Sequence, residues 1–239
     1  SVLGVLSTDQ AVALTTTQAA SLKSTQLSAL STDAIAALET ADLAVVSSTA
    51  VAGLSTAQAV ALTTDEIAAL STVQLANLKS AALAALTTDQ IVALTSDQTA
   101  SLTASRLALM TTDQIAALET GDLAAITSTA IGGMTTAQAA AMTTDQITAL
   151  TSRQIGAMSK NAFAALTTDQ IVALTTDQAS NIAADRIALL TTSQIAALET
   201  DDLAALTSTT VAGMKRAQIS TLSTDQAVAL TTAQAAALK

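Results

Sequence analysis

The chain has 239 residues, half of them hydrophobic, and a formal net charge of −10 at pH 7. It contains no Cys and no His, which excludes a disulfide-stapled domain and the usual ligands of zinc and iron–sulfur centres. The low, acidic charge content excludes the clustered Lys and Arg that nucleic-acid binding needs. The longest apolar runs, such as residues 81–86, fall far short of the roughly twenty residues of a membrane span.

An apolar residue occupies every eighth position, without a break, from Leu6 to Leu238. Such a fixed period is the mark of a repeat array, in which each unit packs on its neighbours. One long helix does not fit, because eight residues at 100° each rotate the apolar stripe by about 80° per repeat. A strand does not fit either, because positions five and eight of the octad would point to opposite faces. The pattern therefore predicts a succession of short helices, each about seven residues long, from octad 7–14 to octad 231–238.

The start of each predicted helix is clear in the octad 111–118. Thr111, at position one, is a preferred N-cap, whose hydroxyl accepts a hydrogen bond from a backbone N–H. Gln114, at position four, completes a capping box. Asp113 lies in the first turn, where the helix dipole favours a negative charge. Most octads carry all or part of this signal, so the sequence predicts a new helix in each.

The apolar positions of the octad predict the core. Ile115 and Leu118, at positions five and eight, are i,i+3 neighbours on one helix face. Met110 precedes the N-cap and pairs with Ile115 as a hydrophobic staple. Helices this short are unstable alone and persist only by stacking. We therefore expect an all-α solenoid with positions five and eight inward, and with Thr at position two and the polar atoms of position three outward. All five Met residues lie at position eight and are predicted to be core residues.

Longer periods, of ten octads and of five octads, overlie the basic repeat. Three segments spaced by ten octads are close copies of one another, namely 31–44, 111–124 and 191–204. The whole chain, 1–239, is thus predicted to be one continuous solenoid of three approximately eighty-residue units, and part of a longer array. Position five becomes small at five-octad spacing, at Ala19, Ala59, Thr99, Ala139 and Ala179. Ile219 breaks this series, and Ala11, Ala227 and Ala235 near the ends lie outside it.

The shorter, forty-residue period contains about five repeats. It suggests that five octads return the chain to the same direction around the axis of the solenoid. This return would be one turn of five helices or two turns of two and a half. One column of alternating charge would then contain Glu39, Lys79, Glu119, Lys160 and Glu199. The alternative is that the ten-octad period is only a gene-duplication length. Gly132 and Gly133 are expected to relieve crowding between stacked turns.

No residue is predicted to be catalytic, cofactor-binding or metal-binding, and no cofactor is expected. The densest carboxylate cluster, Glu199 with Asp201 and Asp202, has copies at Glu39/Asp42 and Glu119/Asp122, which favours a structural use over acid–base catalysis. Calcium binding would need several oxygens converging in one loop, and one Asp at position three of each octad does not supply them. Regular Thr hydroxyls at position two could bind ice or a polysaccharide, could carry O-linked sugar, or could simply keep the surface soluble.

The pattern Leu-Thr-Thr-Asp-Gln-Ile-x-Ala-Leu, seen at Leu86–Leu94 and with Met leading at Met110–Leu118, resembles the Thr/Ala-rich octapeptide-repeat arrays of large bacterial surface or secreted, adhesin-like proteins. The resemblance covers the whole chain but involves a motif of low complexity. It implies an extracellular or cell-surface structural role and transfers no functional residue.

Ser1 enters at position three of an octad, and Lys239 occupies position one of the next. Neither end shows the polar capping repeat of a free solenoid, so further copies are expected to continue the array, covalently or end to end. A heterologous contact of that kind makes a filament. The sequence thus predicts a non-enzymatic stalk or filament whose partner is a second copy, with a surface glycan as a further candidate partner. The alternative is an ice- or glycan-binding surface built from Thr rows.

Overall fold

A computed structural model describes residues 6–238 of the chain, and these residues form 29 short α-helices and no strand. The predicted all-α repeat solenoid, with one helix per octad, is confirmed. Ser1 and Lys239, on which the expectation of uncapped ends depended, lie outside the described residues. The chain divides into two compact units: unit 1 comprises residues up to Leu102 and Leu109–Ala125, and unit 2 comprises Thr103–Ala108 and the residues from Ile126 onward. One continuous solenoid over 1–239 stays a prediction.

The helices of unit 1 are α1 (Thr8–Val12), α2 (Thr16–Ala20), α3 (Ser24–Leu27), α4 (Thr32–Ala36), α5 (Thr40–Val45), α6 (Ser48–Val51), α7 (Thr56–Ala61), α8 (Thr64–Ala69), α9 (Thr72–Asn77), α10 (Ser80–Ala85), α11 (Thr88–Val92), α12 (Ser96–Ala100), α14 (Thr112–Ala117) and α15 (Thr120–Ala125). Those of unit 2 are α13 (Ala104–Leu107), α16 (Ser128–Ile131), α17 (Thr136–Ala141), α18 (Thr144–Ala149), α19 (Ser152–Ala157), α20 (Lys160–Ala164), α21 (Thr168–Val172), α22 (Thr176–Ser180), α23 (Ala184–Ile187), α24 (Thr192–Ala196), α25 (Thr200–Ala205), α26 (Ser208–Ala212), α27 (Arg216–Ile219), α28 (Thr224–Ala229) and α29 (Thr232–Ala237).

The predicted N-caps are confirmed. The hydroxyl of Thr111 accepts a hydrogen bond from the backbone N–H of Gln114 at 3.1 Å, and the Gln114 side-chain oxygen accepts one from the N–H of Thr111 at 2.9 Å. The predicted helix length is wrong, since α14 has six residues and α13 only four. Leu118 adopts an extended conformation directly after α14, at φ −59° and ψ 132°. The chain must turn at this corner to begin the next helix, and the turn consumes the last part of the octad.

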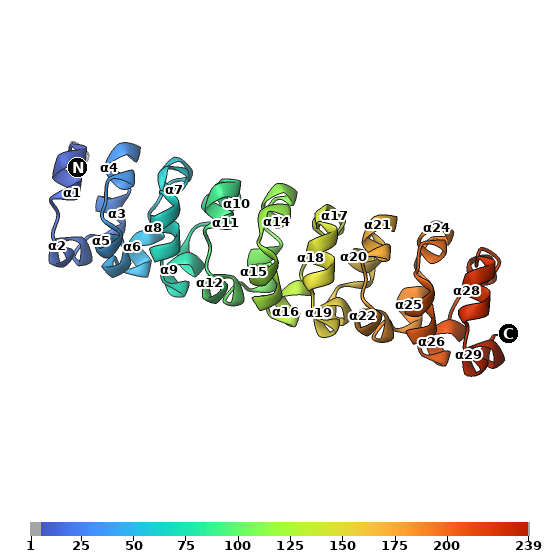
Figure 1. The fold of residues 1–239 in the computed structure, drawn as a ribbon. Helices are drawn as coiled ribbons and strands as arrows, with labels where there is room; N and C mark the ends of the chain where they lie inside the picture. Colours follow the sequence, from blue (N-terminus) through green and yellow to red (C-terminus); the bar gives the residue numbers. More distant parts are fainter. Residues whose placement is uncertain (1–5, 239) are drawn as a thin grey trace. The chain divides into compact units, whose positions relative to one another are not determined.

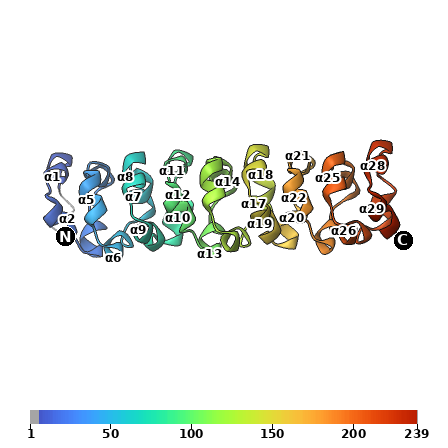
Figure 2. The same cartoon turned by 60° about the horizontal axis from the view of Figure 1, so that its bottom comes forward.

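Helices three apart in the chain pack on one another within each unit. In unit 1, α7 contacts α4 and α10, and α12 contacts α15; in unit 2, α19 contacts α16 and α22. Figures 1 and 2 show this stacking of consecutive turns within each unit, for example α7 beside α10. A turn thus takes more than two and a half octads and fewer than five, so both turn geometries suggested by the forty-residue period are wrong.

The expected charge column is also wrong. Glu39 and Lys79 begin α5 and α10, and Lys160 and Glu199 begin α20 and α25, so in each unit the two residues are five helices apart. Because helices pack on the neighbour three away, residues five helices apart lie at different azimuths. The partner of Lys160 is instead Asp185, whose carboxylate lies 2.7 Å from the Lys160 ammonium.

The core follows the predicted positions. Ile115 and Leu118 are buried, as are most residues at positions five and eight between Leu22 and Met214. The five Met residues are buried in the same register, which confirms their assignment as core residues. Phe163, the single aromatic residue, is fully buried at position five of its octad.

Three glycines, each ten octads from the next, mark close approaches between turns. A Cβ atom at Gly133 would lie 2.6 Å from the Cβ of Ala104 and 2.7 Å from its carbonyl oxygen. Gly213 lies against Ala184, and Gly53 against Ser24, in the same way. The expectation that Gly133 relieves crowding between turns is therefore confirmed, and a side chain at these sites would force the turns apart.

Candidate functional site

The glutamine at position four has two roles, and only one of them follows from the sequence pattern. In Gln90 the side-chain oxygen accepts a hydrogen bond from the N–H of Thr87 at 2.9 Å, as the capping box requires. Its Nε2 group donates to the carbonyl oxygens of Ala59 at 2.9 Å and Leu62 at 2.6 Å. These acceptors lie 31 and 28 positions earlier, between three and four octads back. One side chain therefore begins a helix and joins it to the preceding turn.

We call this contact, from Nε2 to carbonyls about one turn back, the glutamine link. The links to both carbonyls, 31 and 28 positions back, are made by Gln58, Gln74, Gln90, Gln98, Gln114, Gln170, Gln178, Gln218, Gln226 and Gln234. All of these amides are buried. The carbonyls 31 positions back lie in the last turn of a helix and also accept a bond from the corner N–H, as Ala59 does from Leu62. The carbonyls 28 positions back belong to the corner itself, beyond the helix. The link therefore removes buried unpaired groups from both sides of the turn interface.

Sequence reasoning missed the glutamine link, although one signal was present. Position four contains Gln in most octads and Glu only once, at Glu66. Both residues complete a capping box, but only Gln carries the NH₂ donor. The preference for Gln thus pointed to a second partner, whose location in the chain no local pattern could give.

Glu66 shows what happens when the donor is lost. One carboxylate oxygen accepts from the N–H of Thr63 at 2.7 Å and from its hydroxyl at 2.9 Å. The other oxygen is buried without a hydrogen-bond partner. By the spacing of the glutamine links, a Gln at this position would donate to the carbonyls of Ile35 and Leu38 in the preceding turn. Burial raises the pKa of Glu66, and the two bonds from Thr63 only partly oppose this shift.

The three acidic clusters also lie at turn interfaces. Asp122, at position four, accepts a hydrogen bond from the hydroxyl of Ser96 at 2.7 Å, and Asp202 accepts one from Thr176. Burial raises the pKa of Asp202, and the nearby charges of Glu199 and Asp201 raise it further, against the bond from Thr176. The Asp122 carboxylate thus joins consecutive turns, and a structural use of all three clusters stays a prediction.

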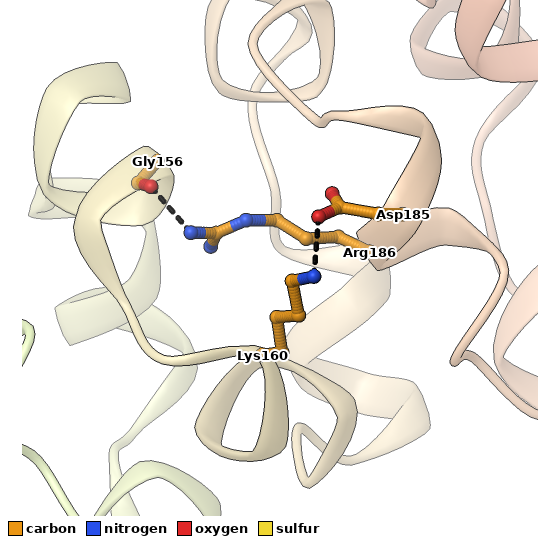
Figure 3. A network of polar contacts seen from close by, with 4 residues as sticks. All are labelled: Gly156, Lys160, Asp185 and Arg186. Carbon is orange, nitrogen blue, oxygen red and sulfur yellow. Dashed lines mark hydrogen bonds and ion pairs between the residues drawn. The ribbon is translucent and has the colours of Figure 1, made fainter.

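Arg186 occupies position four of its octad and replaces the glutamine link with a guanidinium (Figure 3). It donates to the carbonyl of Ile155 at 3.1 Å and to that of Gly156 at 2.6 Å. Its guanidinium carbon lies 5.9 Å from the ring centroid of Phe163, a cation–π distance. Beside it, the bond between Lys160 and Asp185 lowers the pKa of the exposed Asp185.

The surface carries regular hydroxyl groups, as predicted. Thr64, Thr88 and Thr112, at position two of their octads, are exposed and begin α8, α11 and α14. These helices contact one another in succession, so the three Thr residues form one row in unit 1. An exposed Asp follows each of them, which makes this row a mixed line of hydroxyls and carboxylates.

Two properties of the described residues bear on other functions. No group of three or more acidic side chains within residues 6–238 is arranged to hold a metal ion. None of the helices in this part of the chain is long and apolar enough to cross a membrane.

Short capped helices, stacked three apart and joined by buried amides, define an α-solenoid repeat protein. A family model for the ALTTAQ repeat matches residues 35–72, 67–104, 115–152, 149–184 and 195–232, well over half of the chain. The chain belongs to the ALTTAQ repeat family. The six letters of that description are found at 229–234. These residues span the corner at Leu230 and the start of α29, with its N-cap Thr231 and its linking Gln234. No curated protein matches the sequence.

Proposed function

We propose that this repeat array is a structural element that forms a stalk or filament by association of its copies, on a bacterial cell surface or in the extracellular matrix. The observation that carries the proposal is the direction of the glutamine links. Helix α7 donates backward through Gln58 to Leu27 and Leu30, and its own end and corner, Ala59 and Leu62, accept from Gln90. Each turn therefore complements a copy of itself.

A surface that complements its own opposite face gives a heterologous contact, and such contacts propagate until something blocks them. The same bonds that join turns within a unit are thus suited to join turns of different copies. The extracellular location rests on the resemblance of the octad pattern to bacterial surface arrays. A structural and not a catalytic role fits the placement of Asp122 and Asp202 between turns.

Negative-stain electron microscopy of the purified chain over a concentration series tests the proposal. Uniform fibres that lengthen with concentration are expected. A variant with Gln10→Glu and Gln18→Glu, whose side chains are exposed, would place acceptors against the acceptor carbonyls of another copy. It should form shorter fibres, whereas Asp9→Asn, on the same helix, should not. Discrete particles of one chain at all concentrations would contradict the proposal.

The exposed Thr row supports a second candidate, a surface that binds ice or a glycan. Thr64, Thr88 and Thr112 recur every three octads and leave capping to the residue before them. Thermal hysteresis and glycan-array binding of the chain, with Thr88→Val as the variant, distinguish this function from filament formation. Hysteresis or glycan binding that is lost in Thr88→Val would favour the surface function.

A further inference from the structure

Consecutive turns are not joined equally strongly. Among the described residues, one interface has neither a glutamine link nor another hydrogen bond in its place. Asp42 and Ala50 occupy position four of the octads that form α5 and α6. By the spacing of the glutamine links, their acceptors would be the ends and corners of α1 and α2. Among the described residues, no hydrogen bond joins α1 or α2 to α5 or α6. We call this interface the open seam.

The equivalent interfaces ten and twenty octads later in the chain contain hydrogen bonds. In the unit 2 copy, the Thr210 hydroxyl donates to the carbonyl of Ile182 at 2.8 Å. In the second copy within unit 1, the Ser96 hydroxyl donates to Asp122.

At the open seam, Thr16 stands where the copies have Thr176 and Ser96, and Asp42 stands where they have Asp202 and Asp122. Both Asp42 and Asp202 leave one buried carboxylate oxygen without a partner. Among the described residues, no counterpart of the Ser96–Asp122 bond joins Thr16 to Asp42.

The apolar packing of α1, which contacts α4, is also thin. Position five of α1 and α2 is Ala11 and Ala19, each fully buried. The equivalent position of α21 is Ile171, which is also fully buried and adds three more carbon atoms to the core. Less apolar surface is thus removed from water where α1 packs than where α21 packs. The small side chain of Ala11 thus weakens the packing of α1 on α4, beside the interface that lacks hydrogen bonds.

We propose that α1 and α2 open from α5 and α6 as a unit while the rest of unit 1 remains folded. Repeat proteins are held together by interfaces between neighbouring turns, so the weakest interface sets where the array opens. Opening there uncovers the side of the core formed by Leu43 and Val51. The open seam is thus a conformational release point built into the array.

Hydrogen–deuterium exchange of the full chain, followed by mass spectrometry, tests this inference. Under conditions of fast reclosing, amides of residues 8–22 should exchange at least about tenfold faster than those of 168–182, the equivalent segment of unit 2. Their exchange should depend only weakly on added urea, since a local opening exposes little surface. Equal rates for the two segments, or a urea dependence equal to that of global unfolding, would overturn the inference.

A matched pair of variants isolates the missing bond. Ala50→Thr places a hydroxyl where Thr210 has one, and Leu22 offers the carbonyl that corresponds to Ile182. Ala50→Val has the same shape without the hydroxyl. Exchange of residues 16–22 should be about two- to tenfold slower in Ala50→Thr than in Ala50→Val, as expected for one neutral hydrogen bond. Identical exchange in the two variants would show that simple fraying, and not the open seam, controls this segment.

Discussion

The amide nitrogen of Gln90 lies 2.6 Å from the carbonyl oxygen of Leu62, a residue 28 positions earlier in the chain. The same side chain caps its own helix through Thr87. Because both halves of the amide are used, the cap cannot be changed without changing the contact between turns. This coupling of a local signal to a non-local contact makes the octad a unit of both secondary and tertiary structure.

Replacing Gln90 with Glu should lower the free energy of unfolding by about 1–3 kcal/mol. Glu preserves the capping oxygen but turns a buried donor into an acceptor that faces two carbonyls. Urea denaturation followed by circular dichroism measures the change. Gln10→Glu, at an exposed position with the same capping role, is the control and should have a much smaller effect. Equal losses in both variants would refute the role of the link.

Glu66→Gln should raise the free energy of unfolding, because it restores the donor toward the preceding turn. The gain should depend on pH. Since the pKa of Glu66 is raised in the folded state, the folded chain binds a proton more tightly than the unfolded chain. The protonated carboxyl thus stabilises the fold below the ordinary Glu pKa, and this stability is lost as pH rises through the raised pKa.

Unfolding midpoints of the natural chain and of Glu66→Gln from pH 4 to pH 8 therefore should diverge as pH rises. The raised pKa of Asp202 affects the pH dependence of stability in the same direction in both proteins. The difference between their pH profiles therefore isolates Glu66. Glu39→Gln, which changes a carboxylate at an N-cap without a side-chain capping bond, controls for the loss of a charge. Parallel pH profiles would contradict the assignment.

Gly133→Ala should destabilise unit 2 by about 1–3 kcal/mol, because the new methyl group would overlap Ala104. Gly156→Ala is the matched control, since a Cβ at Gly156 meets nothing within 4 Å and the residue lies inside α19. That variant should stabilise the chain by about 0.5–1 kcal/mol through helix propensity. Thermal denaturation of both variants provides the comparison, and a shift of the same sign in both would be inconsistent with crowding at Gly133.

Arg186→Ala should cost about 1–3 kcal/mol, since it leaves the carbonyls of Ile155 and Gly156 without their donor. Arg186→Gln should remain within about 1 kcal/mol of the natural chain, because Gln is the usual residue at position four and loses only the contact with Phe163. Asp185→Asn, which breaks only an exposed ion pair, should change stability little. Chemical denaturation separates these cases, and an Arg186→Gln variant as unstable as Arg186→Ala would refute the equivalence of the two links.

The sequence by itself determined the helices, their starts and their buried faces, because these depend on contacts within one octad. Thr111 and Gln114 are three residues apart, and Ile115 and Leu118 are too, so capping rules and helical periodicity were sufficient. The length of each helix was overestimated because the corner at Leu118 is imposed by the next helix.

Only the tertiary structure decided which octads meet. The choice between turns of three, four or five helices depends on the angle at each corner, which no residue pattern specifies, and the forty-residue period was a misleading guide to it. Partners such as Gln90 and Leu62, or Arg186 and Ile155, are fixed by that angle. The donor was visible in the sequence as a preference for Gln over Glu, but its acceptor is a backbone carbonyl, which every residue possesses and which therefore leaves no mark in the sequence.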